Sequence, residues 1–169
     1  MRILASILLA SAVSAACAPA ALAAECRQAQ AIYTDRDGVY ELSFEPVGSE
    51  AAVVSHHFKI RQVKGDLLLN GHIMTGDEVA RSNAMVMHNC PTGDVTGDEI
   101  AACTVWEGVM YPVAADGAIG ELVPEEGANA AHALLLAGFG PALRYSGAWE
   151  EKKLTDVPWD LLTFKECAK

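Results

Sequence analysis

Apolar and polar residues alternate one by one along residues 39–47. Tyr40, Leu42 and Phe44 share one phase of this pattern, and glutamate and serine residues occupy the other. Because successive side chains of a strand point to opposite faces, the alternation predicts a strand with one face in the core. Pro46 ends this strand or places it at a sheet edge, since proline has no amide hydrogen to donate.

A second alternating segment, residues 53–74, is interrupted once, at Lys64-Gly65. Two such residues between two strand-like runs are typical of a β-hairpin with a two-residue turn. If Val63 pairs with Asp66 across this turn, every other pair of the hairpin is fixed. The turn therefore predicts the register of the whole hairpin.

This register places Phe58 opposite Gly71, where the missing side chain leaves space for the ring. It also places His57 opposite His72 on the outer face. Opposed side chains on neighbouring strands have Cβ atoms about 5 Å apart. A shift by one residue would move the two histidines to opposite faces, so the histidine pair depends on the predicted turn.

Residues 90–113 combine a helix start with the most apolar strand candidate. Thr96 and Glu99 have the spacing of a capping box, in which each side chain binds the backbone amide of the other residue. They predict a short helix over residues 100–103. The β-branched, aromatic and long apolar residues of 104–113 then predict a strand covered on both faces, with a bulge at Gly108.

Three further segments complete the pattern. Residues 82–88 and 159–164 are short apolar runs that predict strands. Pro124, the alanine- and leucine-rich residues 128–137 and Gly138 together predict a helix that begins at the proline and ends at the glycine. These elements predict an α+β protein: a β-rich antiparallel sheet or a partly closed barrel with one or two short helices, stabilised by disulfides.

Residues 1–23 have the features of a secretory signal peptide. The basic start Met1-Arg2 is followed by an apolar run over residues 3–13, which is too short to cross a bilayer as a helix. Ala21-Leu22-Ala23 forms an A-x-A cleavage site. The segment predicts export, to the periplasm or out of the cell.

Residues 24–169 are then expected to form a single globular domain. A lipoprotein signal ending at Cys17 is the alternative, although Ser14 stands where an apolar residue is usual. Both signals leave four cysteines to pair, and an even number in an exported chain favours disulfides. The expected pairs are Cys90–Cys103 and Cys26–Cys167.

The chain is strongly acidic, with 22 Asp and Glu residues against 12 Lys and Arg residues. Loss of Arg2 with the signal peptide changes the formal net charge from −10 to −11. This charge repels phosphate groups and anionic lipids, so we expect no nucleic-acid role and no membrane role after signal cleavage. A cationic protein is the partner that the charge would suit, although solubility alone also accounts for it.

Three groups of side chains are candidates for metal binding. His57 and His72 would share Zn²⁺ or Cu²⁺, because neutral imidazole binds both ions, but the sequence defines no third ligand. Thioethers next to imidazoles favour copper, and neighbouring carboxylates favour calcium. The copper group is His72, Met74, Met85, Met87 and His88, and the calcium group is Asp94, Asp98 and Glu99. Exposed histidines, core methionines and helix-capping acids are the structural explanations of these residues.

The sequence contains neither a G-x-S-x-G nor an H-E-x-x-H motif. We therefore expect an exported, soluble periplasmic binding or interaction protein with an unknown ligand, no catalytic activity and no cofactor. One alternative is a Cu- or Zn-binding protein that uses the histidine pair. The others are an inhibitor of a cationic enzyme such as a lysozyme, and a hydrolase whose site only the fold assembles.

The scattered aromatics are a further candidate surface for a sugar or peptide: Trp106, Tyr111, Tyr145, Trp149 and Trp159.

Overall fold

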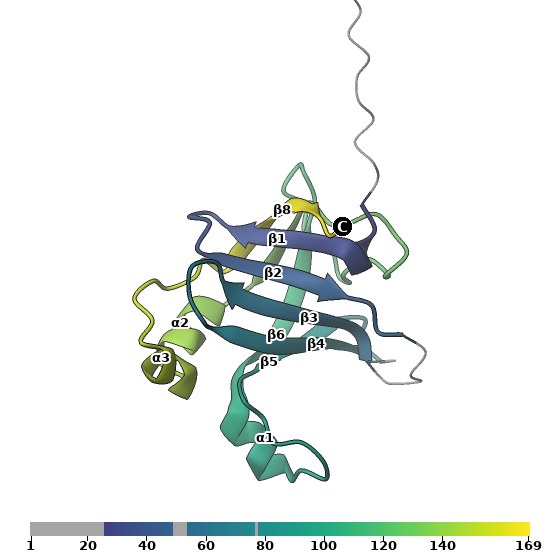
Figure 1. Ribbon diagram of the computed structural model, residues 1–169. Coiled ribbons are helices and arrows are strands. Elements are labelled where there is room, and N and C mark those ends of the chain that lie inside the picture. The colour runs from purple at the N-terminus through teal and green to yellow at the C-terminus, as the bar shows by residue number, and fades with distance from the viewer. Residues whose placement is uncertain (1–25, 49–53, 77) are drawn as a thin grey trace, which may run out of the picture.

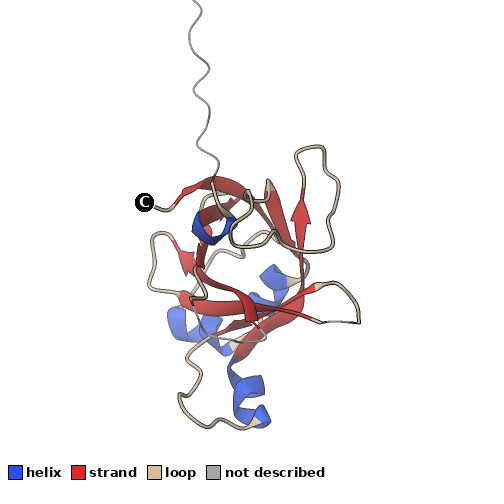
Figure 2. Cartoon of the chain, turned by 90° about the vertical axis from the view of Figure 1, so that its right-hand side faces the viewer, coloured by secondary structure: helices blue, strands red, loops and turns tan. Residues whose placement is uncertain are grey.

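Eight antiparallel strands form a closed barrel in which each strand pairs with the next along the chain and β8 pairs with β1 (Figures 1 and 2). The computed structural model describes residues 26–48, 54–76 and 78–169. The signal peptide expected in residues 1–23, and Cys17 with it, lie outside the described residues. The strands are β1 (Ala31–Asp35), β2 (Tyr40–Glu45), β3 (Val54–Gln62), β4 (Leu68–Thr75), β5 (Ser82–Met87), β6 (Thr104–Val113), β7 (Ala133–Leu136) and β8 (Leu161–Cys167).

The helices are short. Within the described residues they are η1 (Gln28–Gln30, a 3₁₀ turn), α1 (Gly97–Cys103), α2 (Phe139–Arg144) and α3 (Gly147–Lys152). The prediction of a β-rich antiparallel protein is confirmed, but the barrel is fully closed, and the helices outnumber the expected one or two. Closure follows from β1, which the sequence pattern missed, because β1 pairs with both β2 and β8. A closed barrel leaves no free strand edge.

The register predicted for the hairpin is confirmed from His56 to Arg61. The two-residue turn is wrong, because β3 ends at Gln62 and β4 begins only at Leu68, and the pairing shifts by one residue at Val54. Phe58 on β3 pairs with Gly71 on β4, and His57 pairs with His72. Phe58 is 1 % exposed, and the histidines lie on the outer face of the barrel. The alternation of the sequence therefore determined both the partners and the faces of these two strands.

Buried side chains from all eight strands pack into one hydrophobic cluster. Large residues such as Tyr33, Tyr40 and Phe58 are almost wholly buried. Phe139 of α2 meets Trp106 of β6 edge to face, with ring centroids 6.3 Å apart, so α2 extends this core beyond the strands. The barrel interior is thus a packed core, as small eight-stranded barrels commonly have.

The helix expected over residues 124–138 is wrong. The structure places β7 over Ala133–Leu136, between β6 and β8, and residues 120–132 run mainly as loop. Helix propensities differ by only tenths of a kcal/mol between ordinary residues, so they lose to the two neighbouring strands that pair with β7. Gly138 does adopt a left-handed φ of 80°, but it precedes α2.

The bulge expected at Gly108 is also misplaced. The register between β5 and β6 shifts after Val86 pairs with Trp106, since the next pair is Met87 with Thr104. Val105 is therefore the extra residue. The glycine at position 108 is explained by packing instead, because a Cβ there would press on the Trp106 ring.

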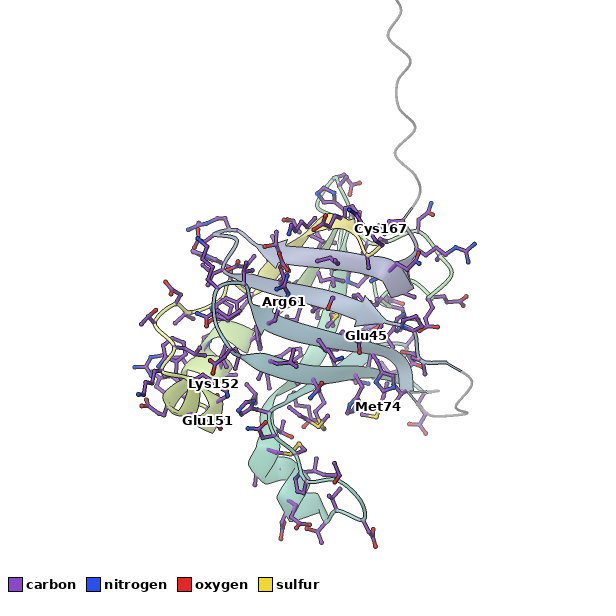
Figure 3. The ribbon with its side chains drawn as sticks, in the orientation of Figure 1. Glu45, Arg61, Met74, Glu151, Lys152 and Cys167 are labelled. Carbon is purple, nitrogen blue, oxygen red and sulfur yellow. A yellow bond between two sulfur atoms is a disulfide. The ribbon has the colours of Figure 1, made fainter. Side chains whose placement is uncertain are left out.

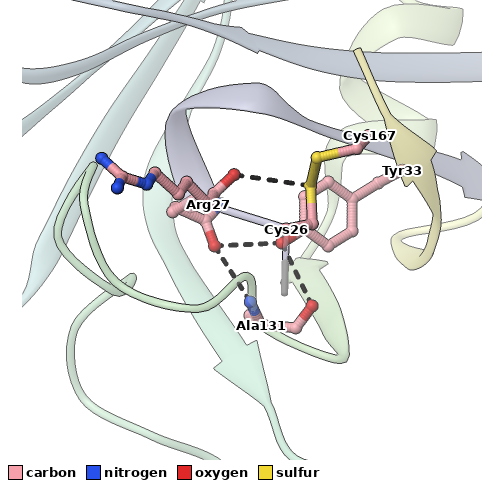
Figure 4. The surroundings of a disulfide bond; sticks show 6 residues. Cys26, Arg27, Tyr33, Ala131 and Cys167 are labelled. Carbon is pink, nitrogen blue, oxygen red and sulfur yellow. Dashed lines mark hydrogen bonds between the residues drawn. A yellow bond between two sulfur atoms is a disulfide. The ribbon is translucent and has the colours of Figure 1, made fainter. Parts of the chain in front are cut away.

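Both expected disulfides are present. Cys26–Cys167 joins residues 141 positions apart, and Cys90–Cys103 joins residues 13 positions apart. Beside the first, the Tyr33 hydroxyl lies 3.1 Å from the Ala131 carbonyl (Figure 4). Two disulfides indicate an oxidising compartment.

None of the helices in the part of the chain that the structure describes has the length and hydropathy needed to span a bilayer.

Candidate functional site

The connection between β5 and β6 forms an arm that projects from the barrel (Figures 1 and 2). We define the arm as residues 90–103, which include α1. None of its residues is buried, yet a disulfide and a capping box hold its shape. Cys90–Cys103 closes its base, and the predicted capping box is present at its tip, where the Thr96 amide donates to Glu99 Oε2 at 2.8 Å and the Glu99 amide donates to Thr96 Oγ1 at 3.3 Å.

The arm carries Asp94, Asp98 and Glu99 and has no basic residue. No ion pair joins these three acids to a basic side chain within the described residues. Several acids on the barrel wall do have basic partners, as Glu45 has Lys59 at 2.7 Å. The arm is therefore an uncompensated negative projection.

A hollow of about 440 Å³ lies between the arm and α3. Two carboxylates line it, Glu99 from the arm and Glu151 from α3. Apolar side chains form much of the remaining wall. The residues around the hollow are His88, Asn89, Pro91, Glu99, Ala102, Cys103, Thr104, Val105, Ser146, Gly147, Ala148 and Glu151.

Three polar side chains meet at one side of this hollow. His88 Nε2 lies 3.1 Å from Glu151 Oε2, and Asn89 Nδ2 lies 3.3 Å from Glu151 Oε1. Asn89 has a φ of 51°, in the left-handed region that asparagine tolerates better than most residues. This backbone turn after β5 directs the side chains of His88 and Asn89 towards α3. Glu151 and Lys152 lie on α3 (Figure 3).

Both carboxylates of the hollow favour their charged form. Hydrogen bonds from the backbone and side chain of Thr96 hold the pKa of Glu99 below its usual value of 4.5. Hydrogen bonds from His88 and Lys152 do the same for the pKa of Glu151. At neutral pH two carboxylates therefore border the hollow beside apolar walls: Glu99, which makes no ion pair within the described residues, and Glu151, which lies 3.3 Å from the Lys152 ammonium group.

Ser146, His88 and Glu151 all line the hollow, which raises the hydrolase alternative. The Ser146 hydroxyl donates to the Leu143 carbonyl at 2.8 Å. His88 directs Nε2 at Glu151 and Nδ1 at the Leu68 carbonyl, 3.4 Å away. Neither ring nitrogen is bound to the serine, so the nucleophile–base contact that defines such a site is not made.

The histidine pair lies on the barrel wall, away from this hollow. His57 is exposed and His72 is half-buried, on adjacent strands. Burial, together with the charge of His57, lowers the pKa of His72 below 6.5. Among the described residues, no three His, Cys, Asp or Glu side chains gather closely enough to hold a metal ion.

The methionines expected in the core point outward instead. Ser82, Ala84 and Val86 form the buried phase of β5, so Met85 and Met87 lie on the outer face. Met85 pairs with His72. His88 is separated from this group, because its side chain turns to α3.

The remaining candidates disperse. The calcium group stays on the arm, where Glu99 serves the capping box. Trp106 and Trp149 are in the core, whereas Trp159 is 43 % exposed beneath the Arg36 guanidinium, 3.7 Å from the ring centroid. Tyr145 is 87 % exposed. The aromatics therefore form no common surface.

Sequence reasoning missed Ser146 and Glu151, because about 60 residues separate them from His88 and only the docking of α3 brings them together. The Cys90–Cys103 disulfide and the capping box of the arm are predicted by the sequence, but its projection from the barrel is not.

No protein-family model matches the chain, and comparisons with curated proteins and with solved structures found no match either.

Proposed function

We propose that this protein is an exported, non-catalytic binding protein of the periplasm or extracellular space, and that its arm recognises a cationic protein. The observation that carries the proposal is the arm itself: it is stiffened by a disulfide and a capping box although it packs against little of the barrel. Stiffening a projecting segment lowers the entropy lost when a partner binds it.

The hollow beside the arm supplies a complementary feature. A lysine or arginine of the partner would place its aliphatic stem against Ala102, Val105 and Ala148 and its cationic group near Glu99 and Glu151. Long basic side chains commonly combine these two environments. Hydrogen bonds between charged groups are also stronger than neutral ones.

The packed barrel interior favours a ligand bound on the surface. The acidic chain also favours a basic partner, because opposite net charge accelerates encounter. Inhibition of a cationic enzyme such as a lysozyme is the version of this proposal that has a direct activity assay.

The test compares two triple variants of equal charge. Asp94→Asn/Asp98→Asn/Glu99→Gln neutralises the arm and keeps the capping box, in which glutamine can replace glutamate. Asp116→Asn/Glu121→Gln/Glu125→Gln neutralises the loop that follows β6, at the opposite end of that strand from the arm. Binding to a panel of cationic exported enzymes, with c-type lysozyme first, is measured by calorimetry at low and high salt, and enzyme inhibition is measured alongside.

We expect the arm variant to bind at least about tenfold more weakly, a loss of about 1.4 kcal/mol, and the loop variant to bind as the wild type does. Added salt should weaken wild-type binding, because it screens exposed charges. Equal binding by the two variants would contradict the role of the arm. Absence of binding across the panel at low salt would contradict the proposed partner class.

A further inference from the structure

A row of chemically distinctive side chains crosses the outer face of the barrel. In the observed register Glu45 on β2 pairs with His57 on β3, His57 with His72 on β4, His72 with Met85 on β5, and Met85 with Glu107 on β6. Each of these residues is exposed or half-buried, and its neighbours along the strand are mostly buried. The row therefore lies on one face and holds two imidazoles and a thioether side by side.

We propose that His57, His72 and Met85 bind one Cu⁺ ion on this face. His72 is the central ligand, with His57 and Met85 on either side. Opposed residues have Cβ atoms about 5 Å apart, so the two outer ligands start roughly 10 Å apart and lean towards His72. The flexible methionine side chain suits this adjustment.

The donor set favours Cu⁺ over other ions. No three His, Cys, Asp or Glu side chains gather within the described residues, so a site built from the usual zinc ligands is incomplete here. A thioether selects soft Cu⁺, and imidazole is compatible with it. Cys26, Cys90, Cys103 and Cys167 are all in disulfides, so methionine is the sulfur ligand that the described chain offers.

The surroundings of the row agree with this assignment. Glu45 is held by Lys59 at 2.7 Å and is therefore an ion-pair partner more than a ligand. Met85 and Glu107 line a hollow of about 370 Å³ beside α1, which leaves access to the sulfur.

Two other methionines provide controls on the same face. Met87 follows Met85 by two residues on β5 and pairs with Asn70 and Thr104, so no histidine is opposite it. Met74 on β4 lies two residues beyond His72, near the end of that strand (Figure 3). Only Met85 is directly opposite a histidine of the pair.

The test titrates the exported chain with Cu⁺ under anaerobic conditions, against the coloured chelator bathocuproine disulfonate. We expect one Cu⁺ per chain, with nitrogen and sulfur neighbours in X-ray absorption. Met85→Leu should weaken binding by roughly tenfold or more, equivalent to about 1.4 kcal/mol, and should remove the sulfur neighbour. His57→Ala/His72→Ala should abolish binding, and Met87→Leu should bind as the wild type does. Circular dichroism establishes that each variant is folded.

Three results would overturn the site. The first is a wild-type chain that leaves all copper with the chelator. The second is wild-type affinity in His57→Ala/His72→Ala. The third is equal weakening by Met85→Leu and Met87→Leu, or retention of the sulfur neighbour in Met85→Leu. These results leave the arm proposal untouched, because the arm variants keep all three copper ligands.

Discussion

The ring of Phe58 on β3 covers the Cα of Gly71 on β4, and a methyl group added to Gly71 would occupy the space of that ring. This contact lies in the core, where Phe58 is 1 % exposed. It fixes the register that also brings His57 and His72 together.

Gly71→Ala should therefore lower the free energy of unfolding by about 1–3 kcal/mol, the usual cost of overpacking a core. Urea denaturation measures the change. Gly76→Ala is the matched control, because a Cβ at Gly76 meets no atom within 4 Å. Equal stability of the two variants would show that the ring can move aside.

Glu41 is an acid on the outer face with a side chain only 5 % exposed, between Arg61 and Lys165. Burial opposes its charge, but the hydrogen bond from Lys165 and the charges of both bases outweigh burial, so the pKa of Glu41 lies below 4.5. A lowered acid pKa stabilises the fold above pH 4.5, and this contribution is lost as the pH falls further.

Glu41→Gln should thus lower the free energy of unfolding at pH 7 by about 1–3 kcal/mol, the scale of hydrogen bonds to charged groups. The difference from wild type should shrink towards pH 3. Glu45→Gln, which breaks the more exposed pair with Lys59, should change stability by at most about 1 kcal/mol. Urea midpoints measured from pH 3 to pH 7 compare the two variants, and equal destabilisation by Glu41→Gln and Glu45→Gln would contradict the special role of Glu41.

His56 is a buried histidine whose hydrogen bonds are satisfied. Its Nε2 donates to the Pro124 carbonyl at 2.9 Å, and its Nδ1 lies 3.0 Å from the Ser55 hydroxyl. Burial lowers its pKa below 6.5, although the backbone bond and the charge of Glu126 oppose this. As the pH falls below 6.5, the unfolded chain binds a proton first, so stability decreases.

His56→Gln should reduce this loss of stability between pH 7 and pH 5.5, and thermal unfolding across that range is the measurement. His132→Gln, at an exposed position, serves as control. If the stability of His56→Gln falls with pH as steeply as that of the wild type, other groups cause the pH dependence.

The two disulfides should contribute unequally. In the chain-entropy model, closing a loop as long as that of Cys26–Cys167 stabilises by roughly 5 kcal/mol, and a loop as short as that of Cys90–Cys103 by roughly 3 kcal/mol. Serine substitution of the first pair should lower the melting temperature more. Substitution of the second should mainly accelerate amide exchange in residues 96–103, and an arm with unchanged exchange would contradict its stiffening by the disulfide.

Local patterns carried much of the fold. Alternation predicted the pairing of β3 with β4 to single residues between His56 and Arg61, although the connection is longer than the two-residue turn expected at Lys64-Gly65. The capping box at Thr96 and Glu99 was likewise legible, because its contacts join residues three positions apart. The even cysteine count favours two disulfides but allows three pairings, of which the structure contains the expected one.

Local patterns give the wrong element over residues 124–138, where a helix is expected and β7 forms instead. Alanine and leucine favour a helix, but the gap between β6 and β8 demands a strand, and backbone pairing with both neighbours outweighs a small intrinsic preference. The outward direction of Met85 and Met87 on β5 was also not predictable, because period-two spacing alone does not say which face of a strand lies in the core.

The sequence by itself determined the register of the β3–β4 hairpin, the capping box of the arm and the acidic charge, because these depend on neighbours along the chain or on composition. Only the tertiary structure decided that the sheet closes into a barrel, that Cys26 reaches Cys167, that Met85 lies beside His72, and that Glu151 meets His88 at one side of the hollow. Such contacts join segments that are distant along the chain, and they form only when the packing of the whole core brings those segments together.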